Sequence, residues 1–251
     1  MKRTLLIISA LALMCIGVRA QNLKATVNGA PIEMIEVEGG TFMMGDHMEQ
    51  RADALPLHEV TLDTYYVGRT EVTQQLWTAV MGYNNSYFKG KYRPVETIDY
   101  DEVQAFIIKL NKLTGINFRL LTEAEWEYAA RGGRHAEKYA YSGGKQPGPV
   151  AWFAENSNRT VHRVGGLQPN ALGLYDMSGN VWELCSDYYG PYDTLDVKDP
   201  QGPEQGVYHV MRGGSCNSSP QSCRVTFRQD NSLMSGDAVV GFRLVLPAED
   251  R

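Results

Sequence analysis

The strongest constraint on the fold is a pair of segments in which glycines, aromatic residues and carboxylates alternate without a regular period. The first reads Gly-Leu-Tyr-Asp-Met-Ser-Gly-Asn-Val-Trp-Glu over residues 173–183, and the second reads Arg-Gly-Gly-Ser over residues 212–215. Neither repeats apolar residues at the 3.6-residue period of a helix or the two-residue period of a strand. Because glycine allows backbone conformations that other residues avoid, both segments predict specific irregular loops.

Two further motifs accompany these segments. Residues 39–45 read Gly-Gly-Thr-Phe-Met-Met-Gly, and residues 119–127 read Arg-Leu-Leu-Thr-Glu-Ala-Glu-Trp-Glu. In this order the four motifs resemble the family of formylglycine-generating enzymes, or sulfatase-modifying factors, from about residue 34 to residue 247. The resemblance implies an α+β fold, a divergent C-type-lectin-like architecture with much irregular structure. It leaves open whether this chain is an enzyme.

The N-terminus has the pattern of an export signal. A basic start at Lys2 and Arg3 precedes an almost wholly apolar run that is short for a membrane span, and small residues then end at Ala20. We therefore expect residues 1–20 to be a signal peptide, residues 21–33 an N-terminal extension and residues 34–251 one sulfatase-modifying factor domain. This organisation predicts an exported protein, periplasmic or extracellular, without membrane insertion after cleavage.

The charge balance argues against nucleic acid as a partner. The chain has a formal charge of -5, and removal of residues 1–20 leaves 21 basic against 29 acidic residues, or -8. A net negative charge disfavours binding to polyanions such as nucleic acids and anionic membranes. We expect a peptide, a glycan or an envelope protein as the partner, and the sequence does not distinguish among these three.

Helix signals occur three times in the first half of the chain. Thr73 is a predicted N-cap for a helix through Met81, and capping boxes at Asp99 and Thr122 predict helices that end near Gly115 and Ala130. Strands are predicted by alternating or β-branched residues. The predicted strands are 34–37 and 41–44 as a hairpin, 60–67, 207–211, 224–228 and 239–245.

The loop over residues 173–183 is a candidate calcium site. Calcium prefers six to eight oxygen ligands and mixes carboxylates with backbone carbonyls. The resemblance implies the side chains of Asp176 and Glu183 and the carbonyls of Gly179 and Val181 as ligands. The alternative is that the two carboxylates bond loop amides or a neighbouring arginine.

Active members of the family oxidise a substrate cysteine to an aldehyde with copper held by two cysteines. By resemblance, these would lie three and eight residues after Ser215, where this chain has Ser218 and Cys223. Soft thiolates favour Cu(I), and a hydroxyl is a poor replacement. Cys216 is a candidate second copper ligand. If the chain is active, the catalytic residues would be Cys223, Cys216, Ser215 and Trp182.

A structural disulfide is the competing interpretation of the cysteines. Three cysteines remain after removal of the signal peptide, and an exported chain meets oxidising conditions. Cys223 is then expected to bridge Cys185 or Cys216. The sequence therefore supports two hypotheses: a non-catalytic binding or accessory module with a structural calcium, or a formylglycine-generating copper oxidase that acts on a sulfatase cysteine.

Overall fold

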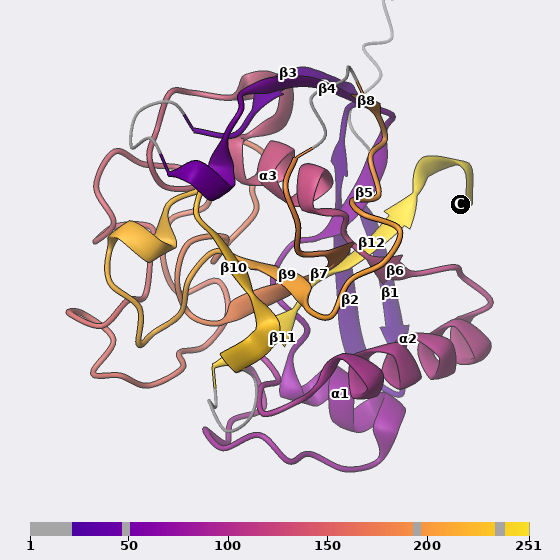
Figure 1. Cartoon of the computed structure of the whole chain (residues 1–251). Helices are drawn as coiled ribbons and strands as arrows, with labels where there is room; N and C mark the ends of the chain where they lie inside the picture. Colours follow the sequence, from indigo (N-terminus) through magenta and orange to yellow (C-terminus); the bar gives the residue numbers. More distant parts are fainter. Residues whose placement is uncertain (1–21, 47–50, 193–196, 234–238, 251) are drawn as a thin grey trace, which may run out of the picture.

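The computed structural model describes residues 22–46, 51–192, 197–233 and 239–250 (Figure 1). The predicted signal peptide lies outside the described residues. The regular part of these described residues consists of three sheets and three α-helices, which confirms the predicted α+β class. None of the helices among the described residues has both the length and the apolar character needed to span a membrane.

The largest sheet has five strands in the order β1-β2-β5-β12-β6. Its last strand in sequence, β12, lies between β5 and β6 and is antiparallel to both. The segment expected as an N-terminal extension forms β1 and the start of β2, so the domain boundary expected at residue 34 falls inside a strand. The strands of this sheet are β1 Leu23–Val27, β2 Ala30–Val37, β5 Tyr65–Gly68, β6 Arg119–Leu120 and β12 Leu244–Pro247.

Two smaller sheets complete the strand pairing. The first has the order β10-β9-β7-β11 and the second β3-β4-β8. Strands β11 and β7 are parallel, as are β4 and β8, and the other pairs are antiparallel. The strands are β3 Gly40–Met44, β4 His58–Leu62, β7 Trp182–Tyr188, β8 Val197–Lys198, β9 His209–Arg212, β10 Arg228–Asp230 and β11 Val240–Phe242.

Two strand predictions were wrong because the chain changes sheet where one continuous element was expected. β2 and β3 do not form a hairpin, and the strand expected over residues 60–67 is divided into β4 and β5. At the crossing, Gly39 donates its N–H to Thr64 Oγ1 at 3.0 Å. A Cβ on Gly39 would lie 2.5 Å from the carbonyl oxygen of Leu62, so only glycine allows this approach.

The later strand predictions were partly right. The strand expected over 207–211 begins at residue 209, and most of the stretch 224–228 lies outside β10. The stretch 239–245 is divided between β11 and β12, which belong to different sheets.

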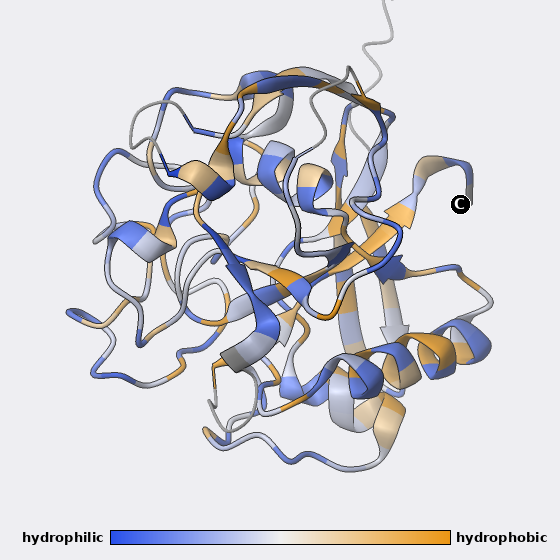
Figure 2. Ribbon diagram, in the orientation of Figure 1, coloured by the Kyte–Doolittle hydropathy of each residue, from blue (hydrophilic) through white to orange (hydrophobic). Residues whose placement is uncertain are grey.

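The three predicted helices are confirmed together with their caps. Helix α1 (Gln74–Met81) has Thr73 as N-cap, and α2 (Tyr100–Thr114) and α3 (Glu123–Arg131) each begin with a complete capping box. Each helix ends at a glycine in the left-handed conformation, which satisfies carbonyls of the last turn. Figure 2 shows apolar and polar residues alternating along α2, as expected for a helix with one buried face.

The apolar core has two main parts. Helices α1 and α2 pack together beside the five-stranded sheet, where Trp77 stacks on Phe106 at a ring-centre distance of 5.1 Å (Figure 1). Helix α3 packs in the second part with residues of the neighbouring strands, among them β3, β7 and β9. Between residues 136 and 181 the structure has no helix or longer strand, as the family resemblance predicted.

Amide side chains that are buried or partly buried form hydrogen bonds with the backbone of this irregular region. Asn170 accepts the N–H groups of Leu172 and Leu174 and donates to the carbonyl oxygen of Ala129. Asn156 accepts from the N–H of Phe153 in a similar way. Since buried backbone groups need hydrogen-bond partners, these side chains take the place of a regular ladder.

Candidate functional site

The turn after β9 places the residues predicted around Ser215. Gly213 and Gly214 have φ values of +91° and +73°, in the region that favours glycine. A Cβ on Gly214 would lie 2.7 Å from the sulfur of Cys223 and 2.8 Å from the carbonyl oxygen of Ser222. The two glycines therefore bring the segment around Cys223 directly against the Arg-Gly-Gly-Ser turn.

Ser218, at the position of the first copper cysteine in active relatives, is part of this turn. Its Oγ accepts the N–H of Ser215 at 2.9 Å and lies 3.1 Å from the Ser215 Oγ. The Ser218 N–H also donates to the Ser215 carbonyl oxygen. The hydroxyl of Ser218 thus stabilises the turn, and Ser215 closes it as a structural residue would.

Cys216 and Cys223 are fully buried but lie in different apolar clusters. Cys216 packs with three valines, including Val161 and Val181, whereas Cys223 packs with Tyr141 and its neighbours. Burial raises the pKa of both thiols to about 12. Because metal ligation and nucleophilic attack need the thiolate, the surroundings of the two sulfurs do not favour a two-thiolate copper site. Copper stays a prediction.

The predicted disulfide is not formed in this structure. Cys185, Cys216 and Cys223 are separate, buried thiols. Cys185 lies on β7 in the apolar cluster around α3, apart from the clusters that hold the other two sulfurs. The three sulfurs pack in different apolar clusters.

Trp182, the remaining predicted catalytic residue, begins β7 and is half-buried. It packs against the cluster that contains Cys216, and its ring centre lies 6.0 Å from that of Phe227. Phe88, from the loop between α1 and α2, packs on the same cluster. The structure therefore brings Trp182 and Cys216 to one apolar region, next to the turn of Ser215.

Asp176, the first predicted calcium ligand, has a buried carboxylate with one oxygen in use. Its Oδ2 accepts the N–H of Gly165 at 2.6 Å, and its Oδ1 has no hydrogen-bond partner. Burial raises the pKa of Asp176 to about 6, although Gly165 and Arg243 act in the opposite direction. An unpartnered buried carboxylate oxygen fits a hard cation.

Glu71 is a neighbour of Asp176 that the sequence motifs did not reveal. It lies between β5 and α1, its Oε1 accepts from the Asn180 side chain at 2.8 Å, and its Oε2 is buried without a partner. Burial, with the charge of Asp176 second, raises the pKa of Glu71 well above its ordinary value. Glu71 lies about 100 residues before Asp176 in a mostly polar segment, so no spacing in the sequence connects it with the calcium loop.

Glu183 does not fit a calcium site, because its two oxygens are bonded elsewhere. Arg243 donates to both of them, at 2.6 and 2.9 Å, and Trp126 donates to Oε2 at 2.8 Å. These bonds are the ones that the alternative to a calcium site describes. Asp176 accepts a hydrogen bond from a backbone amide, and Glu183 pairs with an arginine. Gly179 and Val181 lie in the same loop, and a Cβ on Gly179 would lie 2.2 Å from the Trp152 carbonyl oxygen.

The calcium site predicted from Asp176, Gly179, Val181 and Glu183 stays a prediction. In the described part of the chain, no group of three or more His, Cys, Asp or Glu residues is placed to hold a metal ion. Among the buried carboxylates of the described residues, Asp176 and Glu71 each have one oxygen without a hydrogen-bond partner.

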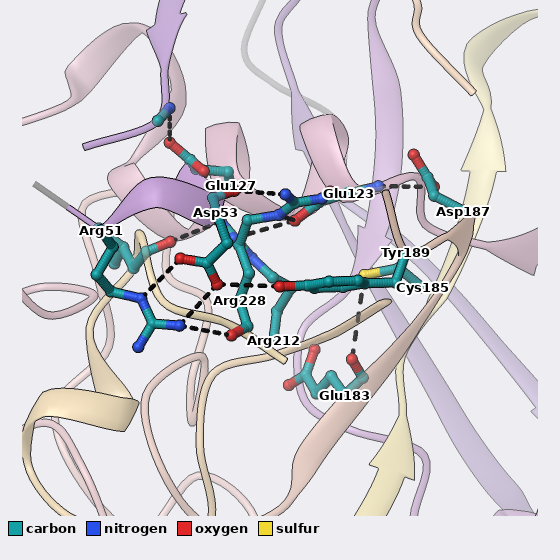
Figure 3. Close-up of polar contacts among 12 residues, drawn as sticks. Arg51, Asp53, Glu123, Glu127, Glu183, Cys185, Asp187, Tyr189, Arg212 and Arg228 are labelled. Carbon is teal, nitrogen blue, oxygen red and sulfur yellow. Dashed lines mark hydrogen bonds and ion pairs between the residues drawn. The ribbon is translucent and has the colours of Figure 1, made fainter. Parts of the chain in front are cut away.

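A buried ion-pair network lies behind the Arg-Gly-Gly-Ser turn (Figure 3). Arg212 donates to Glu123 at 3.2 Å and to Glu127 at 2.5 Å, and Arg228 donates to both oxygens of Glu123 at 2.6 and 2.7 Å. Burial alone would raise the pKa of Glu127, but Arg131 and Arg212 hold it below its ordinary value. The network ties α3 to β9 and β10. Buried ion pairs of this kind are typical of framework residues rather than of a reactive site.

Two surface hollows lie away from the predicted site. One of about 470 Å³ is lined by residues that include Asp63, Arg119 and Glu249, and one of about 320 Å³ by residues that include His58 and Asp187. Among the described residues, neither hollow has Trp182, Ser215, Cys216 or Cys223 in its lining.

Sequence comparison identifies the family. Residues 19–248 match the family described as the sulfatase-modifying factor enzyme 1-like domain. The chain belongs to this family. It is 32% identical to the chaperone protein LppX of Paenibacillus barcinonensis, with 78% of this chain and 82% of LppX covered. It is 35% identical to the formylglycine-generating enzyme of Streptomyces coelicolor, with 62% of this chain and 53% of the enzyme covered.

Structural comparison agrees with this assignment. The Treponema denticola variable protein 1 superposes with a TM-score of 0.84 at 30% identity, and covers 90% of this chain and 99% of its own. The fold is therefore the α+β, C-type-lectin-like fold of formylglycine-generating enzymes, as predicted. The chain spans only about half the length of the formylglycine-generating enzyme that it matches.

Proposed function

We propose that this protein is an exported, non-catalytic binding or accessory module of the sulfatase-modifying factor family. One observation carries the proposal. Ser218 stands where active relatives have a copper cysteine, and its hydroxyl is bonded to the backbone and the side chain of Ser215. A hydroxyl committed to a turn is a poor ligand for Cu(I). The separate surroundings of Cys216 and Cys223 support the same proposal.

The competing function is a formylglycine-generating copper oxidase with Cys216 and Cys223 as the ligand pair. The turn after β9 favours it, because a Cβ on Gly214 would lie 2.7 Å from the Cys223 sulfur and Cys216 follows two residues later. We would titrate the reduced protein with Cu(I) and incubate it in air with a Cys-x-Pro-x-Arg peptide. Mass spectrometry then reports any conversion of the peptide thiol to an aldehyde.

The proposal predicts no tight copper binding and no aldehyde. Ser218→Cys restores the family spacing and is the positive comparison, and Ser219→Cys places a thiol one residue away as its matched control. Copper binding gained by Ser218→Cys alone supports a lost ligand. Stoichiometric copper and aldehyde formation by the unchanged protein, both removed in Cys216→Ala, would establish the oxidase instead.

A structural calcium is a second, separate proposal. The unpartnered oxygens of Asp176 and Glu71 support it, and the pairing of Glu183 with Arg243 argues against the full ligand set. Melting of the protein with calcium and with a chelator tests it. A higher melting temperature in calcium, absent in Asp176→Ala, is expected if the ion binds. Equal melting temperatures in both conditions would reject the calcium proposal.

A further inference from the structure

Two surface segments contain several basic residues and no acidic residue. Residues 82–93 include Lys89, Lys91 and Arg93, and residues 156–166 include Arg159 and Arg163. The two segments lie side by side, since the N–H of Val164 donates to the carbonyl oxygen of Tyr92 at 2.9 Å. A cationic surface thus forms on a chain whose formal net charge is -5.

The side chains of this surface are organised around one tyrosine. The Arg163 guanidinium carbon lies 4.8 Å from the ring centre of Tyr92, and the Lys91 Nζ lies 5.1 Å from it. Cations are attracted to the faces of aromatic rings. We name this surface the Tyr92 patch, and it consists of Tyr87, Lys89, Lys91, Tyr92 and Arg163.

The cations of the Tyr92 patch lack a counter-ion among the residues that the structure describes. Within the described ranges, no ion pair joins Lys89, Lys91 or Arg163 to a carboxylate, although eight arginines elsewhere each have one. Lys91 and Arg163 therefore hold two like charges close to the same ring. Like charges repel at this range, and an anion placed between them would relieve the repulsion.

The patch also exposes aromatic surface beside the candidate site. Tyr87 is 72% exposed and Tyr92 is 45% exposed. The ring of Tyr87 meets that of Phe88 edge to face. Phe88 and Trp182 both pack against the apolar cluster that contains Cys216. Tyrosine and arginine are the residues enriched at the energetic centres of protein interfaces. This composition favours a protein partner.

We propose that the Tyr92 patch binds an acidic peptide segment of a protein partner, a proposal that rests on the binding role proposed above. The net charge of the whole molecule favours a short acidic segment over larger anionic partners. A net negative chain repels an extended polyanion such as nucleic acid or an anionic membrane, which senses the field of the entire molecule. A short acidic segment meets mainly the local cations, because salt screens more distant charges. The exposed tyrosine rings then pack on the apolar parts of the segment.

The test uses a fluorescein-labelled peptide of alternating glutamate and glycine, and a matched peptide with glutamine in place of glutamate. Fluorescence anisotropy with the purified protein measures binding at about 50 and about 500 mM salt, concentrations that span strong and weak screening. We expect the glutamate peptide to bind at low salt and to lose about tenfold or more in affinity at high salt. The glutamine peptide should not bind.

The double variant Lys91→Gln/Arg163→Gln locates the site. We expect it to weaken binding of the glutamate peptide by about tenfold, since each removed charge weakens the attraction. Lys109→Gln/Lys112→Gln on α2 removes the same charge from another exposed surface and is the matched control. Equal binding by both double variants would overturn the proposal. So would equally tight binding of heparin, DNA or phosphatidylserine vesicles, because the surface would then be a general anion binder.

The outcome is independent of the copper experiment. Failure of peptide binding would reject this surface and leave the copper result unchanged. Copper-dependent aldehyde formation would reject the non-catalytic role even if the acidic peptide binds.

Discussion

Arg212, Arg228 and Arg243 in the interior each contact a carboxylate, whereas no carboxylate pairs with Lys91 or Arg163 in the part of the chain that the structure describes. A buried charge without a partner is costly, so the interior must match each arginine. An exposed cation is solvated by water and carries no such requirement. The difference separates charges that hold the fold together from charges that are available to a partner.

The largest change in the free energy of unfolding is expected when one interior carboxylate is removed. Glu123→Ala leaves the buried Arg212 without one of its partners, and it removes the ion pair that the equally buried Arg228 forms within the described ranges. Loss of one partner from a buried pair typically costs about 3–5 kcal/mol of the free energy of unfolding. Urea unfolding measures the change.

Glu33→Ala is the control, because it removes partly exposed pairs with Lys24 and Arg69. Its expected cost is below about 1 kcal/mol. Similar losses for both variants would show that burial does not separate the two kinds of ion pair in this protein.

A smaller change in the free energy of unfolding is expected from Asp187, an interior carboxylate close to Glu123 that forms no ion pair within the described ranges. Burial, with the charge of Glu123 second, raises the pKa of Asp187 to about 7. A carboxyl whose pKa is raised on folding contributes stability below its ordinary pKa, and this contribution is lost as the pH rises toward 7. The loss is at most about 1.4 kcal/mol per pH unit.

Asp187→Asn removes this titration but keeps an acceptor for the Glu123 N–H, which donates to Asp187 at 2.9 Å. Unfolding free energies measured between pH 5 and pH 8 should therefore fall less steeply in the variant. Parallel pH profiles for the two proteins would show that Asp187 remains ionised in the fold.

The smallest change in the free energy of unfolding is expected for a substitution at the surface. Arg163→Gln removes a cation that contacts the ring of Tyr92. Its free energy of unfolding should change by less than about 0.5 kcal/mol, as for most surface substitutions. A loss above about 2 kcal/mol would mean that this cation supports the fold, and the comparison with Arg212 would fail.

Local signals predicted the helices well because each helix carries its start and stop in its own sequence. Thr73, Asp99 and Thr122 cap the helices as expected, and glycines end them. The strands were harder, since the division between β4 and β5 depends on the distant contact of Gly39 with Leu62. No local pattern reports a contact between segments that are far apart in sequence.

The candidate site shows the same limit. The motifs located Asp176, Glu183 and Ser215, but they did not reveal that Glu71 faces Asp176 or that Arg243 occupies the oxygens of Glu183. Both partners come from other parts of the chain and are brought in by tertiary packing. Their charge and residue type alone do not indicate which neighbour they meet.

The position of β12 has a consequence for how the protein is made. β12 lies between β5 and β6, although about 120 residues separate it in sequence from the nearer of the two. During synthesis the five-stranded sheet stays divided until residues 244–247 have left the ribosome, and pairing of such distant segments is slow. The complete sheet therefore forms late in synthesis, and until then a chaperone would bind the strand edges that wait for β12.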